Sequence, residues 1–168
     1  MRRLVLIATL LCSVGSGAQD WGPLQFLVGH WKGEGATTDQ GAGSGAFSFT
    51  PDLRGKVLLR RSFAEYPAAN GKPGYRHDDL MIIYRDSASK DLQAIYFDNE
   101  EHIIHYSIRP VGNGVEFLSA EPSGAARFRL TYTGAGADRL KVKFDIAPPG
   151  KDFATYIEAS ARREGQDK

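Results

Sequence analysis

Gly29-His30-Trp31 follows a short apolar segment and precedes a long series of alternating apolar and polar residues. Asp20-Trp21-Gly22-Pro23 can cap and begin a short helix, because proline tolerates an early helical position, and Gly29 can end that helix. After Trp31 the apolar residues recur at every second position, which is typical of strands buried on one face. The tripeptide therefore marks the change from a short N-terminal helix to an all-β region.

The residues after Gly29 predict about ten short strands. Turn residues separate them, as at Gly112-Asn113-Gly114 and Gly134-Ala135-Gly136, where glycine and asparagine can take positive φ. The expected strands are Trp31–Thr37, Gly45–Pro51, Lys56–Tyr66, Asp79–Arg85, Leu92–Asp98, His102–Pro110, Val115–Glu121, Arg127–Thr133, Arg139–Ile146 and Phe153–Arg163. Closing such an up-and-down antiparallel meander into a β-barrel removes its exposed edges. We therefore expect an all-β barrel of about ten strands, with the short helix closing one end.

Two segments are expected to lie outside the strands. The longest break, Pro67 to His77, contains Asn70-Gly71 and Pro73-Gly74, and at a barrel mouth it would act as a rim or lid. The run Gly41–Gly45 lacks the Gly-Lys-Ser/Thr of a phosphate loop and no helix is expected after it. A flexible hairpin is the interpretation of this run.

The first residues have the pattern of a signal peptide. Met1-Arg2-Arg3 is basic, Leu4–Val14 is apolar, and Ser16-Gly17-Ala18 offers small residues for cleavage. The apolar run is too short to be a permanent membrane span. We expect residues 1–18 to direct export to the periplasm or outside the cell, and residues 19–168 to form a single barrel domain.

The composition of the exported chain excludes other classes. Without Arg2 and Arg3 it carries 19 basic against 20 acidic residues, a formal charge of −1. The only cysteine, Cys12, lies in the predicted signal peptide, so no disulfide is expected. Because no basic stretch is interleaved with aromatic residues, nucleic acid is not an expected partner. No further apolar run is long enough to span a membrane, and the oligomeric state stays open.

Charged and hydroxyl-bearing side chains are the candidates for a ligand site. An arginine that faces the interior must find an anion, because burying it unpaired is costly. Arg60-Arg61 and Arg127-Phe128-Arg129 could pair with Glu65, Asp79 or Glu158, or with a ligand carboxylate. Internal ion pairs or surface charges are the first interpretation of these arginines. The candidate ligand-binding residues are Arg61, His77, Tyr84, Tyr96, His102, Tyr106 and Arg129.

Tyr96-Phe97-Asp98-Asn99-Glu100-Glu101-His102 is the densest polar segment. Its first interpretation is a tight hairpin in which Asp98 and Asn99 bond their own backbone. The same segment places carboxylates beside an imidazole, which are the parts of a general acid–base pair. A structural role and a chemical role both stay open for it.

The spacing of the histidines bears on metal binding. His102 and His105 are three residues apart, which in a strand places their side chains on opposite faces. A metal would need His102 together with a donor from elsewhere, such as His77 or Asp79. We expect hydrogen-bonded or solvated histidines, with no metal site and no cofactor.

The two ends of the domain resemble the signature of the calycins, which include the lipocalins and the fatty-acid-binding proteins. The resemblance rests on Gly29-x-Trp31 at the head of the first strand and on Arg162 or Arg163 at the end of the last. It implies that Trp31 plugs the closed end of the barrel, with a guanidinium laid over its ring. It also implies an internal pocket.

Phe26-Leu27-Val28-Gly29-His30-Trp31-Lys32-Gly33-Glu34-Gly35 resembles the Leu-x-Gly-x-Trp-x-Gly-x-Gly start of nitrobindin-type barrels and of uncharacterised exported bacterial lipocalin-like domains. Asp79–Tyr84 and Tyr96–Glu100 are similar to segments of the second group. Nitrobindins hold haem through a histidine near the carboxyl end, whereas no histidine follows His105 here. The resemblance therefore implies the barrel and its pocket, and haem is not expected.

These features favour an exported barrel that binds a small, largely apolar ligand with a polar or anionic end. The first alternative is a lipocalin-like enzyme of the isomerase or lyase type, so enzyme activity stays open. Its proton transfer would use Tyr84, Tyr96 or Tyr106 with His102, Glu100 or an arginine. A structural envelope protein with a filled barrel is the second alternative. A histidine–carboxylate or tyrosine–arginine pair converging in one pocket would favour the enzyme.

Overall fold

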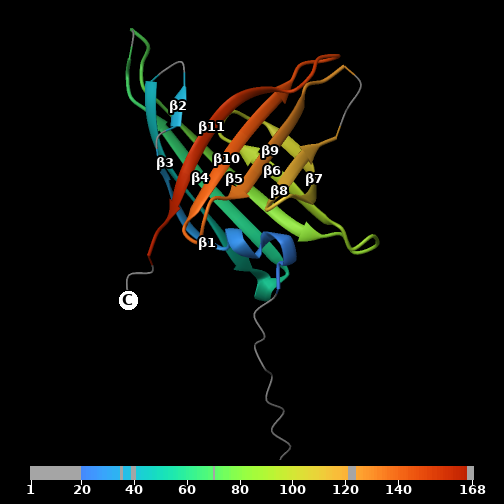
Figure 1. Ribbon diagram of the computed structural model, residues 1–168. Helices are drawn as coiled ribbons and strands as arrows, with labels where there is room; N and C mark the ends of the chain where they lie inside the picture. Colours follow the sequence, from blue (N-terminus) through green and yellow to red (C-terminus); the bar gives the residue numbers. More distant parts are fainter. Residues whose placement is uncertain (1–19, 35, 39–40, 70, 121–123, 166–168) are drawn as a thin grey trace, which may run out of the picture.

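The computed structural model describes residues 20–34, 36–38, 41–69, 71–120 and 124–165, so the predicted signal peptide lies outside the described residues. The strands are β1 (Gly29–Glu34), β2 (Ala36–Thr38), β3 (Gly41–Asp52), β4 (Val57–Tyr66), β5 (Tyr75–Arg85), β6 (Leu92–Asp98), β7 (Ile103–Val111), β8 (Gly114–Ser119), β9 (Arg127–Gly134), β10 (Arg139–Ala147) and β11 (Ala154–Arg163). Two short 3₁₀ helices, η1 (Gly22–Leu27) and η2 (Leu53–Gly55), accompany them (Figure 1).

The strands form one closed antiparallel sheet. Each strand from β2 to β11 pairs with the next one along the chain, and β1 pairs with both β3 and β11. β2 pairs with β3 just beyond the segment that β1 occupies, so β1 and β2 share one position in the ring. The predicted all-β barrel of about ten strands, with a short helix before it, is confirmed.

β5 begins at Tyr75, whereas the sequence predicted a strand from Asp79. Tyr75 is the cross-strand partner of Tyr66 in β4, and the two rings stack with their centroids 4.9 Å apart. Aromatic pairs of this kind stabilise a sheet, which extends the hairpin past the predicted end. The break predicted over Pro67–His77 is therefore shorter, and His77 lies in a strand rather than a loop.

The run Gly41–Gly45, predicted as a flexible hairpin, is the beginning of β3. Gly45 pairs with Ala64 of β4, and a Cβ atom at position 45 would lie 2.5 Å from the carbonyl oxygen of Phe63. No side chain tolerates such a contact, so glycine here permits the close approach of two strands. The predicted strand Trp31–Thr37 is likewise divided between β1 and β2.

η1 lies across one end of the barrel (Figure 1). The side chain of Asp20 accepts a hydrogen bond from Gly22 N at 2.8 Å, which caps the start of the helix. Leu24 and Leu27 are fully buried against the barrel. Trp31 Nε1 donates to the carbonyl oxygen of Leu27 at 2.8 Å, so the first strand is bonded to the helix that covers it.

Arg163 lies over the face of Trp31, with its Cζ atom 4.1 Å from the ring centroid. Its two terminal nitrogens donate to the carbonyl oxygens of Val28 at 2.7 Å and Phe26 at 2.8 Å. These bonds join the last strand to η1 and keep the guanidinium paired at the edge of the closed end. Arg162, the adjacent residue, faces outward and forms an ion pair with a glutamate of β1.

The closed half of the barrel is filled by side chains that are less than 2% exposed. The largest of them are Trp21, Trp31, Tyr132, Phe49, Phe117, Leu24, Leu27, Leu58, Met81, Ile83, Leu140 and Val115. Within the described part of the chain, no helix has the length and apolar character needed to cross a membrane.

Candidate ligand site

Toward the end opposite η1, the inward-facing residues of the barrel are partly exposed rather than buried. The strand pairings identify the inward-facing positions. Two residues paired across neighbouring strands point to the same face of the sheet, so the partners of buried residues such as Trp31 and Met81 also face inward. Many of these positions are nevertheless partly exposed: Gly33, Gly45, Phe47, Ser62, Ala64, His77, Asp79, Tyr96, Ile104, Phe128, Val142, Phe144, Ile157 and Ala159. A side chain that faces into a closed barrel contacts solvent only where the interior is open. We call the space lined by these residues the upper interior.

The walls of the upper interior differ in chemistry. The wall from β1, β3, β4 and β11 carries small residues: Gly33, Gly45, Ala64 and Ala159. β9 and β10 contribute Phe128 and Phe144, whose rings stack with centroids 6.1 Å apart. β5 and β6 contribute polar side chains, among them His77 and Tyr96. Apolar side chains of β9 and β10 thus face polar side chains of β5 and β6 across the upper interior, beside a wall of small residues.

Arg60 of β4 faces inward and forms an ion pair with Asp79 of β5 through Nη1 and Oδ1. The two side chains are only 9% and 6% exposed. Burial lowers the pKa of Arg60, but the Asp79 carboxylate, with Tyr132 and Tyr96, outweighs that effect and raises it. Arg60 is therefore a permanent cation held inside the barrel.

Tyr132 of β9 lies at the floor of the upper interior. Its ring contacts Phe49 and Phe117 of the filled half, with centroids 5.4 and 5.9 Å away, and Phe47 of the upper interior at 5.7 Å. Burial raises the pKa of Tyr132 to about 12, although the nearby charge of Arg60 acts to lower it. The hydroxyl is therefore protonated at neutral pH and available as a donor.

Two buried polar atoms at this floor lack a hydrogen-bond partner of full geometry. They are Arg60 Nε and Tyr132 Oη, and the described residues supply neither with such a bond. The guanidinium of Arg60 and the hydroxyl of Tyr132 nevertheless lie close enough to interact, and each shifts the pKa of the other. Buried polar groups in native proteins nearly always have a partner, so an acceptor oxygen beside these two side chains would complete their hydrogen bonding.

A chain of hydrogen bonds crosses the polar wall from the mouth inward. His77 Nδ1 lies 3.2 Å from Glu100 Oε1, and His77 Nε2 lies 3.0 Å from Tyr96 Oη. Tyr96 Oη donates to Asp98 Oδ2 at 3.2 Å, and His102 Nδ1 contacts the same oxygen at 2.9 Å. The exposed groups of the mouth are thereby connected to a buried carboxylate.

The environment separates the acidities of Tyr96 and Asp98. Burial, with the carboxylates of Asp79 and Asp98, raises the pKa of Tyr96 above its ordinary value. Burial would also raise the pKa of Asp98, but hydrogen bonds from the backbone and imidazole of His102 and from the backbone of Glu100 hold it below its ordinary value. Tyr96 is thus a phenol that donates, and Asp98 is a carboxylate that accepts.

The hairpin predicted at Tyr96–His102 is confirmed for Asp98, whose Oδ1 accepts from the backbone nitrogens of Glu100 and His102 at 2.9 Å each. The prediction for Asn99 is wrong, because its side chain bonds β5 instead of its own turn. Asn99 Oδ1 accepts from the backbone nitrogen of Asp78 at 3.1 Å, and its Nδ2 donates to a backbone carbonyl of the same strand at 3.0 Å. Asn99 therefore joins the turn to the neighbouring strand.

Of the predicted ligand residues, the structure brings His77, Tyr96, His102 and Tyr106 together. His77 and Tyr96 line the upper interior, and His102 lies at its mouth with 56% of its side chain exposed. Tyr106 is buried below them, and its ring contacts that of Tyr96 edge-on with the centroids 6.4 Å apart. These residues come from β5, β6 and β7 and from the turn between β6 and β7.

Arg61, Tyr84 and Arg129 lie on the outer surface instead. Each is next in sequence to an inward-facing residue, so the pleat directs it away from the interior. Arg129 forms an ion pair with Asp145 (Nε–Oδ2 2.9 Å), and its guanidinium lies 4.3 Å from the ring centroid of Phe153. The structure thus separates these three residues from the upper interior.

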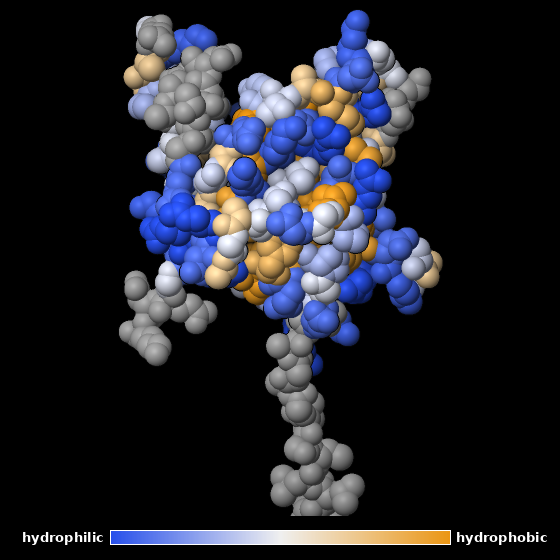
Figure 2. Space-filling model, in the orientation of Figure 1, coloured by the Kyte–Doolittle hydropathy of each residue, from blue (hydrophilic) through white to orange (hydrophobic). Residues whose placement is uncertain are grey.

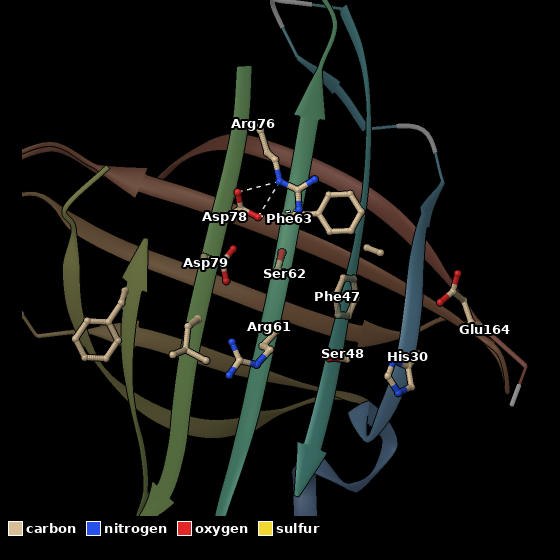
Figure 3. Close-up of a pocket in the computed structure, with 13 residues that line it drawn as sticks. His30, Phe47, Ser48, Arg61, Ser62, Phe63, Arg76, Asp78, Asp79 and Glu164 are labelled. Atoms are coloured by element: carbon tan, nitrogen blue, oxygen red, sulfur yellow. Dashed lines mark hydrogen bonds and ion pairs between the residues drawn. The ribbon is translucent and has the colours of Figure 1, made fainter. Parts of the chain in front are cut away.

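Arg61 lies in a shallow groove of about 530 Å³ on the outer face of β1, β3, β4 and β5 (Figure 3). Arg76 occupies the same groove, with its guanidinium 4.2 Å from the ring centroid of Phe63 and hydrogen-bonded to Asp78 at 2.9 Å. Elsewhere on the outside, Figure 2 shows hydrophilic and hydrophobic side chains interspersed, as is usual for a protein surface. The buried donors without an acceptor lie inside the barrel, so the interior is the stronger site.

Sequence reasoning considered Arg60 together with Arg61 but named only Arg61 as a ligand residue, and it missed Tyr132. Asp79 was considered as a partner for an inward-facing arginine, and it is the residue that pairs with Arg60. Leu58-Leu59-Arg60-Arg61 does not alternate in polarity, so it gives no signal of which arginine faces inward. The alternation Phe128, Leu130, Tyr132 could have placed Tyr132 inside, but nothing in the sequence relates it to Arg60.

Both histidines of the site contact carboxylates: His77 contacts Glu100 and His102 contacts Asp98. Across the described ranges, no set of three or more histidine, cysteine, aspartate and glutamate side chains is grouped so that it could hold a metal ion.

The sequence matches no protein-family model and no curated protein. Among solved structures, the fold is similar to the crystal structure of Rv2717c from M. tuberculosis, with a TM-score of 0.58 and 14% identity over 84% of this chain and 95% of that one. It is also similar to the S-type phycobiliprotein lyase CPES from Guillardia theta, with a TM-score of 0.50 and 8% identity over 86% of this chain and 92% of that one. The fold is a closed antiparallel β-barrel similar to those of these two proteins. At these identities the likeness concerns the fold alone.

Proposed function

We propose that the protein binds a small, largely apolar molecule in the upper interior, with the polar end of that molecule at Arg60 and Tyr132. The apolar body would contact Ile104, Phe128 and Phe144, which face inward and are partly exposed. Covering such surface contributes about 25 cal/mol for each Å² removed from water. On the opposite wall the ligand would lie against Ala64 and Ala159, whose side chains end at Cβ.

The observation that carries the proposal is the pair of buried donors, Arg60 Nε and Tyr132 Oη, without an acceptor. A buried polar group left unsatisfied costs about 1–3 kcal/mol. A ligand oxygen that accepts from both would offset this cost on binding. The same two groups favour a binding protein over a structural protein with a filled barrel. A filled apolar core would leave them buried without hydrogen bonds.

Native mass spectrometry before and after organic extraction tests the proposal directly. We expect a reproducible extra mass on the mature protein that extraction removes. Ala159→Phe places a ring in the upper interior and should abolish the extra mass. Glu158→Phe, at the adjacent outward-facing position of β11, is the matched control and should retain it. An extra mass that survives Ala159→Phe unchanged would contradict binding at this place.

Tyr132→Phe separates a ligand role from a structural role. Removing a buried hydroxyl that has no partner should leave the free energy of unfolding unchanged or raise it by up to about 1 kcal/mol, while ligand affinity falls. Tyr84→Phe, which makes the same change on the outer surface, should alter neither. If Tyr132→Phe lowers the urea midpoint and leaves ligand binding intact, the hydroxyl serves the fold and the proposal loses its main support.

A second candidate is an enzyme that moves a proton on a bound carbonyl compound. Two groups of side chains that face the upper interior favour this enzyme. One is the tyrosine–arginine pair of Tyr132 and Arg60, and the other is the hydrogen-bonded chain His77–Tyr96–Asp98. The two donors would polarise the carbonyl, and His77 would exchange the proton with solvent. Incubation of 2-nonanone with the protein in D₂O, followed by NMR, measures this exchange. Deuterium incorporation that is lost in His77→Gln is expected for the enzyme, and none above the buffer rate for a binding protein.

Two features of the sequence extend the proposal. The sequence Phe26–Gly35 supports a relationship to nitrobindin-type barrels and to exported lipocalin-like domains. The histidine with which nitrobindins hold haem has no counterpart in this sequence. Residues 1–18 support export to the periplasm or outside the cell. Expression of the full chain with N-terminal sequencing of the product tests the second point, and cleavage after Ala18 is the expected result.

A further inference from the structure

The polar groups around the upper interior form one connected set, which we call the interior polar cluster. Its members are Arg60, Asp79, His77, Tyr96, Glu100, Asp98 and His102. The connection between its two halves is the approach of His77 Nε2 to Asp79 Oδ2 at 3.9 Å. The charges of the cluster therefore act together on whatever enters the space.

The cluster carries no excess of positive charge. Its carboxylates belong to Asp79, Asp98 and Glu100, and its only permanent cation is Arg60. If both histidines are protonated, acids and bases balance. If both are neutral, the acids are in excess. The net charge of the cluster is thus zero or negative in every protonation state of the histidines, so an anion that enters the upper interior gains no attraction from an excess of positive charge.

Arg60 is not available as a counter-ion, because Asp79 already holds its Nη1. A carboxylate placed at Nε would lie near the Asp79 carboxylate as well, and like charges in a buried site repel strongly. A cationic end is also disfavoured at the floor, since it would meet the guanidinium. What remains free at the floor is the hydrogen-bonding capacity of two donors, Arg60 Nε and Tyr132 Oη.

From this geometry we infer that the polar end of the ligand is an uncharged hydrogen-bond acceptor, such as a carbonyl or ether oxygen, and not a carboxylate, a phosphate or an amine. The inference rests on the proposed function and specifies its ligand class. Asp79 is then the residue that determines specificity, because it neutralises Arg60 and leaves only a hydrogen-bonding role to the guanidinium. The sequence had left both a polar and an anionic end open, and the ion pair between β4 and β5 distinguishes them.

Competition between matched ligands tests the inference. The neutral fluorophore N-phenyl-1-naphthylamine serves as the reporter, and 2-nonanone, nonanoate and nonylamine compete for it at neutral pH. The competitors share a chain length and differ at the polar end. We expect 2-nonanone to displace the reporter at a concentration at least about tenfold lower than either charged competitor. Equal or tighter binding of nonanoate or nonylamine would overturn the inference.

Asp79→Asn reverses the expected preference. It releases the guanidinium of Arg60, so the affinity for nonanoate should rise about tenfold or more while that for 2-nonanone changes little. Asp78→Asn, the neighbouring outward-facing carboxylate that pairs with Arg76, is the matched control and should leave all affinities unchanged. An Asp79→Asn variant that folds, by its near-ultraviolet circular dichroism, and gains no affinity for nonanoate would contradict the role given to Asp79.

Tyr132→Phe tests the inference independently of whether the Asp79 variant folds. It removes one donor from the floor, so 2-nonanone should bind about fivefold more weakly, once the reporter's own affinity for the variant has been measured and used to correct the competition. An unchanged affinity for 2-nonanone would show that the Tyr132 hydroxyl does not donate to the ligand oxygen, which would contradict the inference. If neither the reporter nor any competitor binds the wild-type protein, the proposed function fails, and the inference fails with it. If nonanoate binds as well as 2-nonanone, only the inference fails.

Discussion

Asparagine in place of Asp79 would leave the guanidinium of Arg60 without its anionic partner inside the barrel. The two side chains are 9% and 6% exposed, so water offers little compensation for the lost charge. Removing one member of a buried ion pair costs about 3–5 kcal/mol. Because the asparagine oxygen can still accept a hydrogen bond from Nη1, we expect the lower end, a loss of about 3 kcal/mol in the free energy of unfolding.

Urea denaturation measures this loss through the fluorescence of Trp21 and Trp31, both buried near the closed end. With an m-value of about 2 kcal/mol per molar, the midpoint of Asp79→Asn should fall by about 1.5 M. The double variant Arg60→Met/Asp79→Leu replaces the pair with apolar groups of similar size. Its midpoint should return to that of the wild type or exceed it, because such replacements are neutral or stabilising by about 1–4 kcal/mol.

Comparing the stabilities of the two variants shows whether the ion pair stabilises the fold or serves ligand binding. If an apolar pair folds as well as Arg60 with Asp79, the charges contribute little net stability, and their presence fits a role in binding. The double variant should then be stable and fail to bind 2-nonanone. A shift of less than about 0.3 M for Asp79→Asn, or a double variant no more stable than the single one, would refute the account of a tightly coupled buried pair.

Three further predictions concern the closed end and the polar wall. Trp31→Ala should lower the free energy of unfolding by about 3–5 kcal/mol, since Arg163 lies over the ring. The control Arg162→Ala should change it by less than about 0.5 kcal/mol. An unchanged urea midpoint for Trp31→Ala would exclude a structural role for Trp31 at the closed end. His102→Ala should stay within about 1 kcal/mol of the wild type in the same assay, because the side chain is 56% exposed, and a loss several times larger would indicate a buried network. The pKa of Asp98 is lowered in the folded protein, so its stabilisation is present above the unfolded pKa of about 3.9 and is lost as the pH falls through the folded value. Asp98→Asn should therefore cost about 1–3 kcal/mol at neutral pH, and the difference from the wild type should shrink below about pH 4; a difference that is independent of pH would contradict this assignment.

The strands could be predicted because their signals are local. Leu140, Val142 and Phe144 alternate with polar residues, and the pairing of β10 with β9 and β11 places them on the inward face as that pattern predicts. Where the signal was absent, the prediction failed. Arg76, His77 and Asp78 look like loop residues, yet they extend β5 because the stacked tyrosines at its end hold the hairpin together.

The site was less predictable than the fold. His77, Tyr96 and His102 were nominated for their chemistry, and closure of the sheet brings them together. Arg61 was nominated where Arg60 faces inward, because a shift of one residue reverses the face of every side chain in a strand. In β4 the apolar pair is followed by a charged pair, so only the pairing with β3 and β5 determines the face.

By itself the sequence determined that the chain forms an antiparallel meander, where several of its turns lie, and that a tryptophan and a terminal arginine mark the ends of the domain. These properties depend on side-chain periodicity and turn chemistry over a few residues. The tertiary structure alone decided that Arg163 rather than Arg162 covers Trp31, and that Arg60 of β4 meets Tyr132 of β9. The reason is physical: strands far apart in the chain become neighbours only when the sheet closes, and the register of that closure selects which side chains share the interior.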